Sequence, residues 1–196
     1  MLKSRVLLLA AFLTSATGAM AQRRGASGGG SGGTGFWYGV GVAPGWARVS
    51  CSLCASDRVT GVSAYIALGG RTSRALRIGG ELAAWRERDA GVTQTLMSIG
   101  AAAYWYPNLR RRLYLSGGAA LNMQRASDGT EVVTSSGIGP LMGIGLEWPL
   151  GQSWLVGPFA HYSVGVFGGD VKFNGGEAAS SARVSFFQLG MSLTRR

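Results

Sequence analysis

After its first segment, the chain lacks any apolar run long enough to form a transmembrane helix. Such a helix needs about 20 consecutive, mainly apolar residues, and no later stretch of the 196 residues comes near that length. If the folded part lies in a membrane, it must therefore be a closed sheet, because hydrocarbon offers no partners for unpaired backbone groups.

Cysteine and histidine are also scarce, with two cysteines and one histidine in the whole chain. A zinc site at Cys51 and Cys54 would need further ligands, and His161 lies in a different predicted strand. The sequence thus predicts no metal site, and nothing in it indicates a cofactor. In an exported protein, the C-x-x-C motif of Cys51 and Cys54 favours a disulfide that closes a short loop; a redox centre would need a different fold.

The N-terminal residues have the three regions of a secretory signal peptide. A short basic region precedes the apolar run Val6–Leu13, and Ala19-Met20-Ala21 forms an A-x-A cleavage site. We therefore predict a signal peptide at residues 1–21, followed by a flexible glycine- and serine-rich linker at 22–35. Residues 36–196 remain, and their number suits one domain.

Acidic residues are few, nine against 19 lysines and arginines. Removal of Lys3 and Arg5 with the signal peptide lowers the formal net charge from +10 to +8, so nucleic acid has to be considered as a partner. The arginines, however, lie at separate turn tips, and no recognition helix or RNA-binding motif accompanies them. Contact with anionic lipid headgroups explains this charge more simply, and we predict no nucleic-acid partner.

From residue 36 onward, apolar residues alternate with small or polar ones at the two-residue period of β-strands. One register of the fifth segment carries Leu113, Leu115, Gly117, Ala119, Leu121 and Met123, and the other carries Tyr114, Ser116, Gly118, Ala120, Asn122 and Gln124. The predicted strands are Phe36–Arg48, Gly61–Gly69, Ala75–Trp85, Thr95–Tyr106, Arg112–Gln124, Gly137–Trp148, Trp154–Phe167 and Arg183–Thr194. The pattern predicts an all-β fold, a single closed antiparallel up-and-down β-barrel of about eight transmembrane strands.

Short and long connections alternate between these strands. Gly70–Arg74, Pro107–Arg111 and Pro149–Ser153 are short, whereas Val49–Thr60, Arg125–Ser136 and Gly168–Ala182 are long and polar, with Arg86–Gln94 intermediate. The short turns and the chain end carry arginines and no acid, while seven of the nine acidic residues lie in or beside the longer connections. Outer-membrane barrels have short turns on one side and long loops on the other, so we expect the long loops to face the outside.

One register of each strand is expected to face the lumen. In the first strand it contains Trp37, Gly39, Gly41, Ala43 and Gly45. An eight-stranded barrel leaves an interior just wide enough for side chains, so small residues there relieve crowding. Aromatic residues at the strand ends predict two interfacial belts, with Trp105, Tyr106, Trp148 and Trp154 at the short turns and Trp46, Trp85 and Phe167 toward the long loops.

The last strand, Arg183–Thr194, alternates Ser185, Phe187, Leu189, Met191 and Leu193 with Val184, Phe186, Gln188, Gly190 and Ser192. With the preceding strands and the signal peptide, this pattern resembles the small eight-stranded outer-membrane β-barrels of Gram-negative bacteria, the OmpA/OmpX-like class. The resemblance covers residues 36–196. It implies location in the outer membrane, contact with its lipids and lipopolysaccharide, and recognition of Arg183–Thr194 by the barrel-assembly machinery. Members of the class usually end on an aromatic residue, whereas this chain ends on Thr194-Arg195-Arg196.

Three charged residues are expected to point into the lumen. Arg77 and Glu81 share parity in one predicted strand, and Glu147 lies in the inward register of another. Unpaired charges in a narrow lumen would be costly, so we predict a structural charge network rather than an ion-conducting path. The inward polar residues Tyr104, Asn122, His161 and Gln188 are expected to join it.

One pattern suggests catalysis: His161-Tyr162-Ser163, with Glu177 further along the chain. Residues two apart in a strand share a face, as a nucleophile and its base require. The pattern is similar to that of the outer-membrane lipid A deacylases, which carry Asn after the serine where this chain has Val164. The predicted parity points His161 and Ser163 into the lumen, away from lipid, and so favours a structural histidine.

We therefore predict a non-enzymatic outer-membrane barrel with a narrow, plugged lumen, which supports envelope structure or surface contacts through its external loops. The first alternative is a lipid A-modifying hydrolase that uses His161, Ser163 and Glu177. The second is a soluble, secreted barrel that binds a small apolar ligand, as lipocalins do. That barrel would have large apolar residues inside and polar residues outside. The sequence does not specify the external partner.

Overall fold

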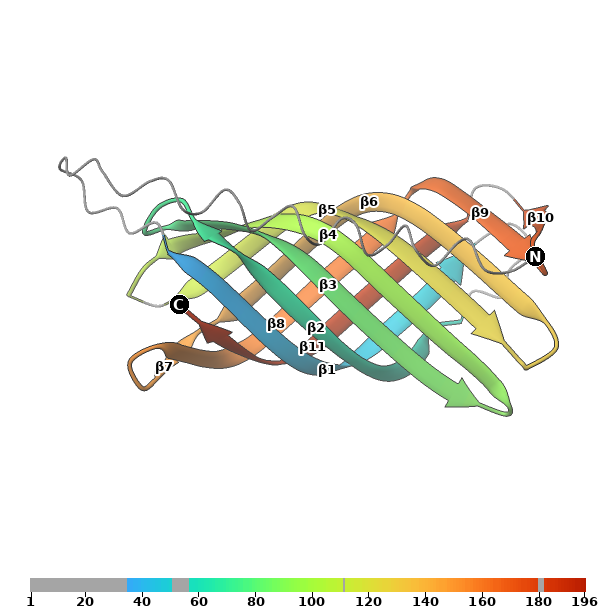
Figure 1. Ribbon diagram of the computed structural model, residues 1–196, viewed down its shortest axis with the longest axis horizontal. Helices are drawn as coiled ribbons and strands as arrows, with labels where there is room; N and C mark the ends of the chain where they lie inside the picture. Colours follow the sequence, from blue (N-terminus) through green and yellow to red (C-terminus); the bar gives the residue numbers. More distant parts are fainter. Residues whose placement is uncertain (1–34, 51–56, 111, 180–181) are drawn as a thin grey trace, which may run out of the picture. The chain divides into compact units, whose positions relative to one another are not determined.

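The computed structural model describes residues 35–50, 57–110, 112–179 and 182–196. Within these ranges the chain forms eleven β-strands: β1 (Phe36–Ser50), β2 (Val59–Arg71), β3 (Leu76–Asp89), β4 (Val92–Asn108), β5 (Leu113–Ser127), β6 (Val132–Leu146), β7 (Trp148–Leu150), β8 (Trp154–Gly165), β9 (Phe167–Phe173), β10 (Gly176–Ala179) and β11 (Arg183–Arg195). They form one tilted sheet that curls into a barrel (Figure 1). No helix in the described ranges is long and apolar enough to cross a membrane.

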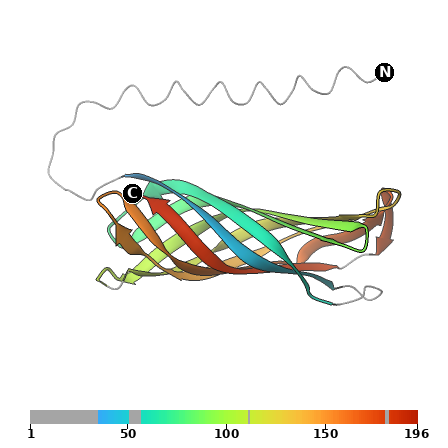
Figure 2. The ribbon, with the colours of Figure 1, turned by 90° about the horizontal axis from the view of Figure 1, so that it is seen from below.

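The sheet closes into an antiparallel barrel of eight strand positions. Strands β1 to β6 pair in chain order, and β11 pairs with both β1 and β8. Closure comes from β6, which pairs with β8 and β9, while β7 pairs with β8. One barrel strand therefore consists of β6 and β7, interrupted at Glu147, and another consists of β8 and β9, interrupted at Val166. The predicted all-β, eight-stranded, up-and-down barrel is confirmed; Figure 2 shows it from a second direction.

The division of each strand into an inner and an outer register follows the predicted parity. In β5, Tyr114 and Asn122 are buried in the lumen, whereas Leu115 is 39% exposed on the outer surface. In β1, Trp37 is buried and its neighbour Phe36 is 67% exposed. The outer surface carries aliphatic side chains in continuous rows, a pattern that suits hydrocarbon as the surrounding solvent.

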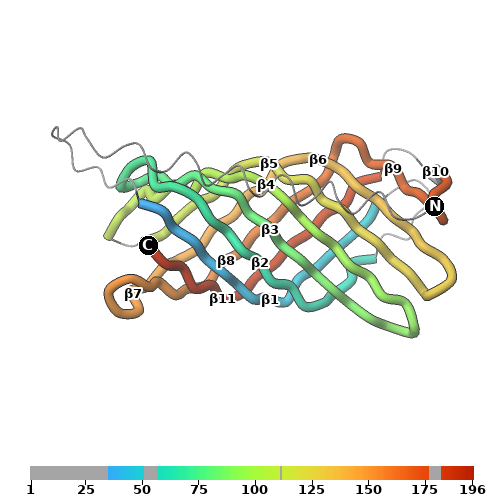
Figure 3. The backbone as a smooth tube through the Cα atoms, in the orientation of Figure 1, coloured from blue at the N-terminus to red at the C-terminus, as the bar shows by residue number. Residues whose placement is uncertain are grey.

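The two ends of the barrel differ. We call the first the turn end: it carries the short turns at 72–75, 109–112 and 151–153, and β1 begins and β11 ends there (Figure 3). At the opposite loop end lie the β3–β4, β5–β6 and β9–β10 hairpins. The predicted sorting of connections between two ends is thus present in the fold.

Two of the three long polar loops, Arg125–Ser136 and Gly168–Ala182, were predicted wrongly, because the strands there continue well beyond their predicted ends. The segment Arg125–Ser136 contains only a short turn at 128–131, and Gly168–Ala182 contains most of β9 and all of β10. The predicted connection Arg86–Gln94 shrinks to residues 90–91. Where both faces of a hairpin meet water, the apolar alternation fades, but the backbone groups still pair with the adjacent strand. Residues 51–56 of the first predicted loop lie outside the described part of the chain.

Tight turns join the strands at the loop end. Ala90-Gly91 has φ values of 47° and 86°, and Asn174-Gly175 has 47° and 88°, as two-residue hairpins of type I′ require. In the turn at 128–131, the carboxylate of Asp128 accepts hydrogen bonds from the backbone N–H of Glu131 at 2.8 Å and of Thr130 at 2.9 Å. These bonds hold the pKa of Asp128 below its usual value.

The predicted aromatic belts are only partly present. Trp105 and Trp148 are 52% and 50% exposed near the turn end, and Phe167 is 72% exposed on the outer surface. Tyr106 and Trp85, however, are buried in the lumen. The parity of their strands, rather than their position near strand ends, decides their direction, because successive side chains point to opposite faces of a sheet.

Candidate functional site

The lumen near the turn end holds a buried ion pair. Arg77 of β3 donates from Nη1 and Nη2 to the two carboxylate oxygens of Glu147, at 3.0 and 3.2 Å. The two side chains are only 8% and 5% exposed. The guanidinium carbon also lies 4.6 Å from the ring centroid of Tyr106 and 5.8 Å from that of Trp37. A planar guanidinium matches a carboxylate in this two-bond arrangement, so each charge has its partner inside the barrel.

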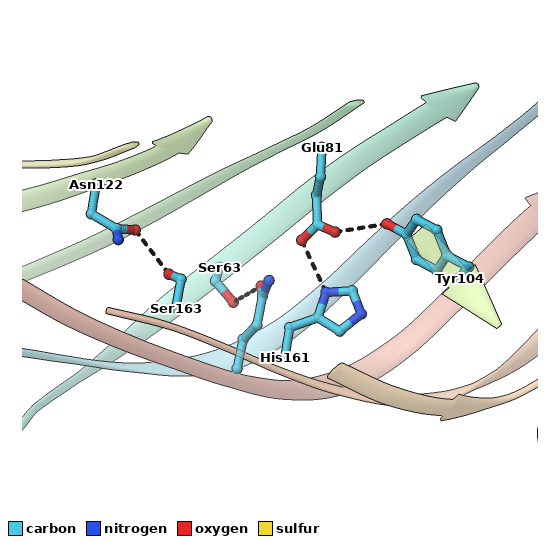
Figure 4. Close-up of polar contacts among 7 residues, drawn as sticks. Ser63, Glu81, Tyr104, Asn122, His161 and Ser163 are labelled. Carbon is cyan, nitrogen blue, oxygen red and sulfur yellow. Dashed lines mark hydrogen bonds and ion pairs between the residues drawn. The ribbon is translucent and has the colours of Figure 1, made fainter. Parts of the chain in front are cut away.

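A second buried group lies around Glu81 of β3 (Figure 4). Its Oε1 lies 3.0 Å from Nδ1 of His161 in β8, and its Oε2 accepts a hydrogen bond of 2.7 Å from the hydroxyl of Tyr104 in β4. The rings of Phe159 and Tyr65 lie beside the imidazole, with centroids 4.9 and 5.2 Å away. Glu81 thus binds the adjacent strand β4 and, across the lumen, the non-adjacent strand β8, and it does not pair with Arg77 of the same strand.

Two further polar pairs cross the lumen (Figure 4). Ser163 of β8 donates to the side-chain oxygen of Asn122 in β5 at 2.8 Å. Ser63 of β2 donates to the side-chain oxygen of Gln188 in β11 at 3.2 Å and to the carbonyl of Ala43 at 2.9 Å. Hydrogen-bonded side chains therefore join most of the barrel strands through the interior.

Glycines make room for these large side chains. A Cβ atom at Gly143 would collide with the imidazole of His161 and the hydroxyl of Ser116, and one at Gly145 would meet the ring of Tyr114. The inward glycines of β6 are therefore the places where side chains from neighbouring strands lie against the backbone. This contact gives the glycine-rich inner register its steric reason.

Toward the loop end, apolar side chains fill the lumen. Trp85 reaches across from β3, and its indole N–H donates to the carbonyl of Gly45 in β1 at 3.0 Å. Trp85, Leu96 and Phe186 are each only 2% exposed. Beyond them lies a cavity of about 220 Å³, lined by the inward residues Val49, Gln124, Ala126, Val133, Ser135 and Val171. This apolar part of the lumen was not predicted from the sequence, although the parity of Trp85 in its strand indicated an inward side chain.

His161 and Ser163 do not form a hydrogen-bonded base and nucleophile. His161 binds Glu81 and Ser163 binds Asn122, and in the described part of the chain no hydrogen bond joins the histidine to the serine. Both residues are only 2% exposed. The backbone of Glu177 lies in β10, where it pairs with Lys172 of β9. An activated nucleophile needs its base within hydrogen-bond reach, and this arrangement does not provide one.

The part of the chain that the structure describes does not include a metal site. The described residues contain no group of three or more His, Cys, Asp or Glu that could hold a metal ion. Cys51 and Cys54 lie outside the described residues, so their predicted disulfide stays a prediction. What the described part of the lumen offers chemically is a set of buried polar groups that are mostly paired, although Nε2 of His161 and Nδ2 of Asn122 have no hydrogen-bond partner there.

Comparison with solved structures places this architecture among known folds. The Neisserial surface protein A, NspA, superposes with a TM-score of 0.54 at 21% sequence identity, over 82% of this chain and 97% of that one. Ail of Yersinia pestis matches at 15% identity over 81% and 97% of the two chains with a TM-score of 0.47. OprG of Pseudomonas aeruginosa matches at 9% identity over 83% and 97% with a TM-score of 0.46. No protein-family model and no curated protein matches the sequence. The likeness to NspA shows that the chain has the fold of the small eight-stranded outer-membrane barrels.

Proposed function

We propose that the protein is a non-enzymatic barrel of the outer membrane, exported by its N-terminal signal peptide, with a lumen closed by its own side chains. The observation that carries this proposal is the contrast between the two registers. Buried polar pairs, with Arg77–Glu147 and Glu81–His161 as the charged ones, occupy the inside, while Ile66, Leu82 and other aliphatic residues cover the outside. Such a protein is stable only where its outer face meets hydrocarbon.

The same contrast opposes a soluble ligand-binding barrel. A lipocalin-like protein keeps its apolar side chains for the lumen and its polar ones for water. Here Val62 is 75% exposed and Ile66 51%, whereas Asn122 and Gln188 are buried. Burial of these two amides in the lumen and exposure of the aliphatic residues would destabilise the barrel in water.

The closed lumen leaves the outer surface and the loop end for function. Side chains from β1, β3, β8 and β11 fill the interior with almost no exposed area, so an open conduction path would require them to move. We infer that the protein supports envelope structure or surface contacts through the hairpins of its loop end. Assembly would use the alternating strand β11 as the signal for the barrel-assembly machinery.

Expression of the full chain in a Gram-negative host tests the proposal. The protein should fractionate with the outer membrane, and unheated samples should migrate differently from heated ones in gels, as folded barrels do. Purified protein in planar bilayers should produce no conductance steps. Recovery in the soluble periplasmic fraction would contradict the membrane location, and regular conductance steps would contradict the closed lumen.

A separate assay tests the hydrolase alternative. Lipid A should keep the same acylation pattern in cells that express the wild-type protein and in cells that express Ser163→Ala. Loss of an acyl chain with the wild type alone would indicate a hydrolase.

A further inference from the structure

A row of cations and hydroxyls runs across the outer surface near the loop end. The strand register places five outward residues side by side on β3, β4, β5, β6 and β9: Arg86, Thr95, Arg125, Thr134 and Lys172. We call these five residues the cation row. Basic and threonine side chains alternate in it, so the cations lie two strands apart, about 10 Å from one to the next.

Toward the turn end, the outward rows next to the cation row become progressively more apolar. The adjacent outward row, on the same strands and β2, consists of Ala64, Ala84, Met97, Met123, Ser136 and Asp170. The following row is Ile66, Leu82, Ile99, Leu121, Ile138 and Phe167. Within two steps along the strands the surface thus changes from charged to aliphatic. In a barrel that crosses a membrane, this change marks the outer interface.

A hollow of about 920 Å³ follows the cation row and its alanine- and methionine-containing neighbour. It lies on the outer surface, because the inward residues between the two rows, such as Trp85 and Leu96, are only 2% exposed. On β9 the hollow is lined by outward Asp170 and Lys172, and not by inward Val171. Ala64 and Ala84 leave a shallow floor, and the longer arginine and methionine side chains form its walls.

The cations of this row have no acidic partner in the described part of the chain. The charge contacts found there, Arg77–Glu147 and the contact of Glu81 with the His161 imidazole, both lie in the lumen. Asp170, the one acid that lines the hollow, forms neither of them and leaves the lining with three cations against one anion. Guanidinium groups bind phosphate oxygens through two parallel hydrogen bonds. The hydroxyl of Thr134 can donate a further one, while that of Thr95 donates to the carbonyl of Arg125 at 3.4 Å.

We propose that the cation row and the hollow beside it bind the phosphorylated headgroup of an outer-leaflet glycolipid. Arg86, Arg125 and Lys172 contact its phosphates, while its acyl chains lie over the alanines and methionines toward the aliphatic row. A headgroup with more than one phosphate, or two adjacent headgroups, can contact several of the evenly spaced cations at once. The inference rests on the proposed location in the outer membrane and names a lipid contact of that membrane-embedded barrel.

On the opposite side of the barrel, the outward cations Arg48 of β1 and Arg183 of β11 do not line the hollow. On β1 and β11, the paired outward residues Trp46 and Phe187 stack with ring centroids 5.4 Å apart. Aromatic rings of this kind anchor a barrel at the interface without selecting an anionic headgroup. The inferred lipid site lies between β2 and β9, where the cations and the hollow coincide.

The test measures lipid A binding to the full-length mature barrel folded in phosphatidylcholine nanodiscs, by native mass spectrometry. A triple variant, Arg86→Gln/Arg125→Gln/Lys172→Gln, removes the cations of the row. A matched triple variant, Arg58→Gln/Arg88→Gln/Arg183→Gln, removes three exposed basic residues near the loop end but outside the row. Ala84→Phe fills the floor of the hollow without changing charge.

The row variant should bind bisphosphorylated lipid A at least ten-fold more weakly than the wild type, and the matched variant should lose less than three-fold. Ala84→Phe should also weaken binding, while inorganic phosphate at millimolar concentration should compete poorly. Equal losses of lipid A affinity in the two triple variants would show that binding depends on overall charge and not on a specific site. Full competition by inorganic phosphate would show an anion site without lipid contacts. Either result overturns the inference.

A failure of the proposed outer-membrane function can be distinguished from a failure of the lipid-site inference. Wild-type barrel that does not insert into lipid and shows no heat-dependent gel migration contradicts the outer-membrane assignment before any variant is compared. Wild-type barrel that inserts, together with a row variant that binds lipid A normally, contradicts the lipid site alone.

Discussion

At the scale of single residues, the buried ion pair between Arg77 and Glu147 is the contact with the largest expected effect on stability. Both side chains are more than nine-tenths buried, and each supplies the other's charge partner. Removal of one partner leaves an uncompensated charge inside the barrel, and such a loss costs about 3–5 kcal/mol. The aromatic rings of Trp37 and Tyr106 beside the guanidinium offer it little replacement for a carboxylate.

We expect Glu147→Gln and Arg77→Met each to lower the free energy of unfolding by about 3 kcal/mol or more. The double variant Arg77→Met/Glu147→Gln should lose less than the sum of the single losses, because it leaves no unpaired charge. Denaturant titration of the barrel in lipid vesicles measures all three. Additive losses would mean that the two residues do not interact.

Gly143 allows a second prediction at this scale. A Cβ there would collide with the side chains of His161 and Ser116, whereas a Cβ at Gly117, on the outer face of β5, would meet nothing within 4 Å. Gly143→Ala should therefore destabilise the barrel by about 1–3 kcal/mol through overpacking. Gly117→Ala serves as the matched control and should change stability by no more than about 0.5 kcal/mol. Similar unfolding midpoints for the two variants would contradict this steric role of Gly143.

At the scale of elements, the hairpins at the loop end depend on turn chemistry as well as on pairing. The β3–β4 turn places Ala90 at a φ of 47°, a left-handed conformation that costs an ordinary residue about 1–2 kcal/mol. The β9–β10 turn has the same geometry with Asn174 in that position. Asparagine tolerates this conformation better than other non-glycine residues.

Ala90→Asn should therefore stabilise the barrel by up to about 1 kcal/mol, and Ala90→Val should destabilise it by a similar amount or more. The measurement is the unfolding midpoint in the same vesicle assay. Asn174→Ala is the matched control in the other hairpin and should reduce stability. A stabilising Ala90→Val would show that the turn adopts a different conformation.

The strands were predicted well where they cross the aliphatic part of the barrel and poorly at the loop end. Phe36–Arg48 was expected and β1 runs from Phe36 to Ser50, but β4 begins at Val92 instead of Thr95 and β6 at Val132 instead of Gly137. The two-residue period is local and strong where one face meets apolar surroundings. The apolar period weakens where both faces of a strand contact water. At such strand ends, the neighbouring strand alone determines whether backbone pairing continues.

At the scale of the whole molecule, the outward rows set the depth of the barrel in a membrane. The centre of the apolar surface lies near the row that contains Ala101 and Ala119, several rows from the outward residue Ser127. A lysine at the bilayer midplane costs about 2–4 kcal/mol, and one near the interface about 0–1 kcal/mol. The cost of a lysine should therefore depend on the row in which it stands.

Ala119→Lys should destabilise the barrel in vesicles by about 2–4 kcal/mol, and Ser127→Lys by about 1 kcal/mol at most. Both substitutions lie on the outer face of β5, so they differ in depth and not in parity. Equal costs at the two positions would contradict a membrane centred on the aliphatic rows. A negligible cost at both would favour a barrel surrounded by water.

The inward direction of Arg77, Glu81, Glu147 and His161 followed from parity alone, because side chains alternate between the two faces of every strand. Their partners did not follow from it. Arg77 binds Glu147, which is 70 residues away, and Glu81 binds His161, which is 80 residues away. Such pairings depend on the register between strands and on the closure of the barrel, and no local pattern encodes either.

By itself, the sequence determined the architecture: an alternating chain with short basic turns, little acid and no long apolar run can satisfy its backbone in hydrocarbon only as a closed barrel. The tertiary structure alone decided which luminal charges pair, and it alone aligned Arg86, Thr95, Arg125, Thr134 and Lys172 in one row. Local periodicity arises within each strand, whereas a row across strands exists only after their registers are set. The scarcity of acidic residues thus has a structural consequence, because Glu81 and Glu147 are paired inside the barrel and the cation row has no acidic partner among the described residues.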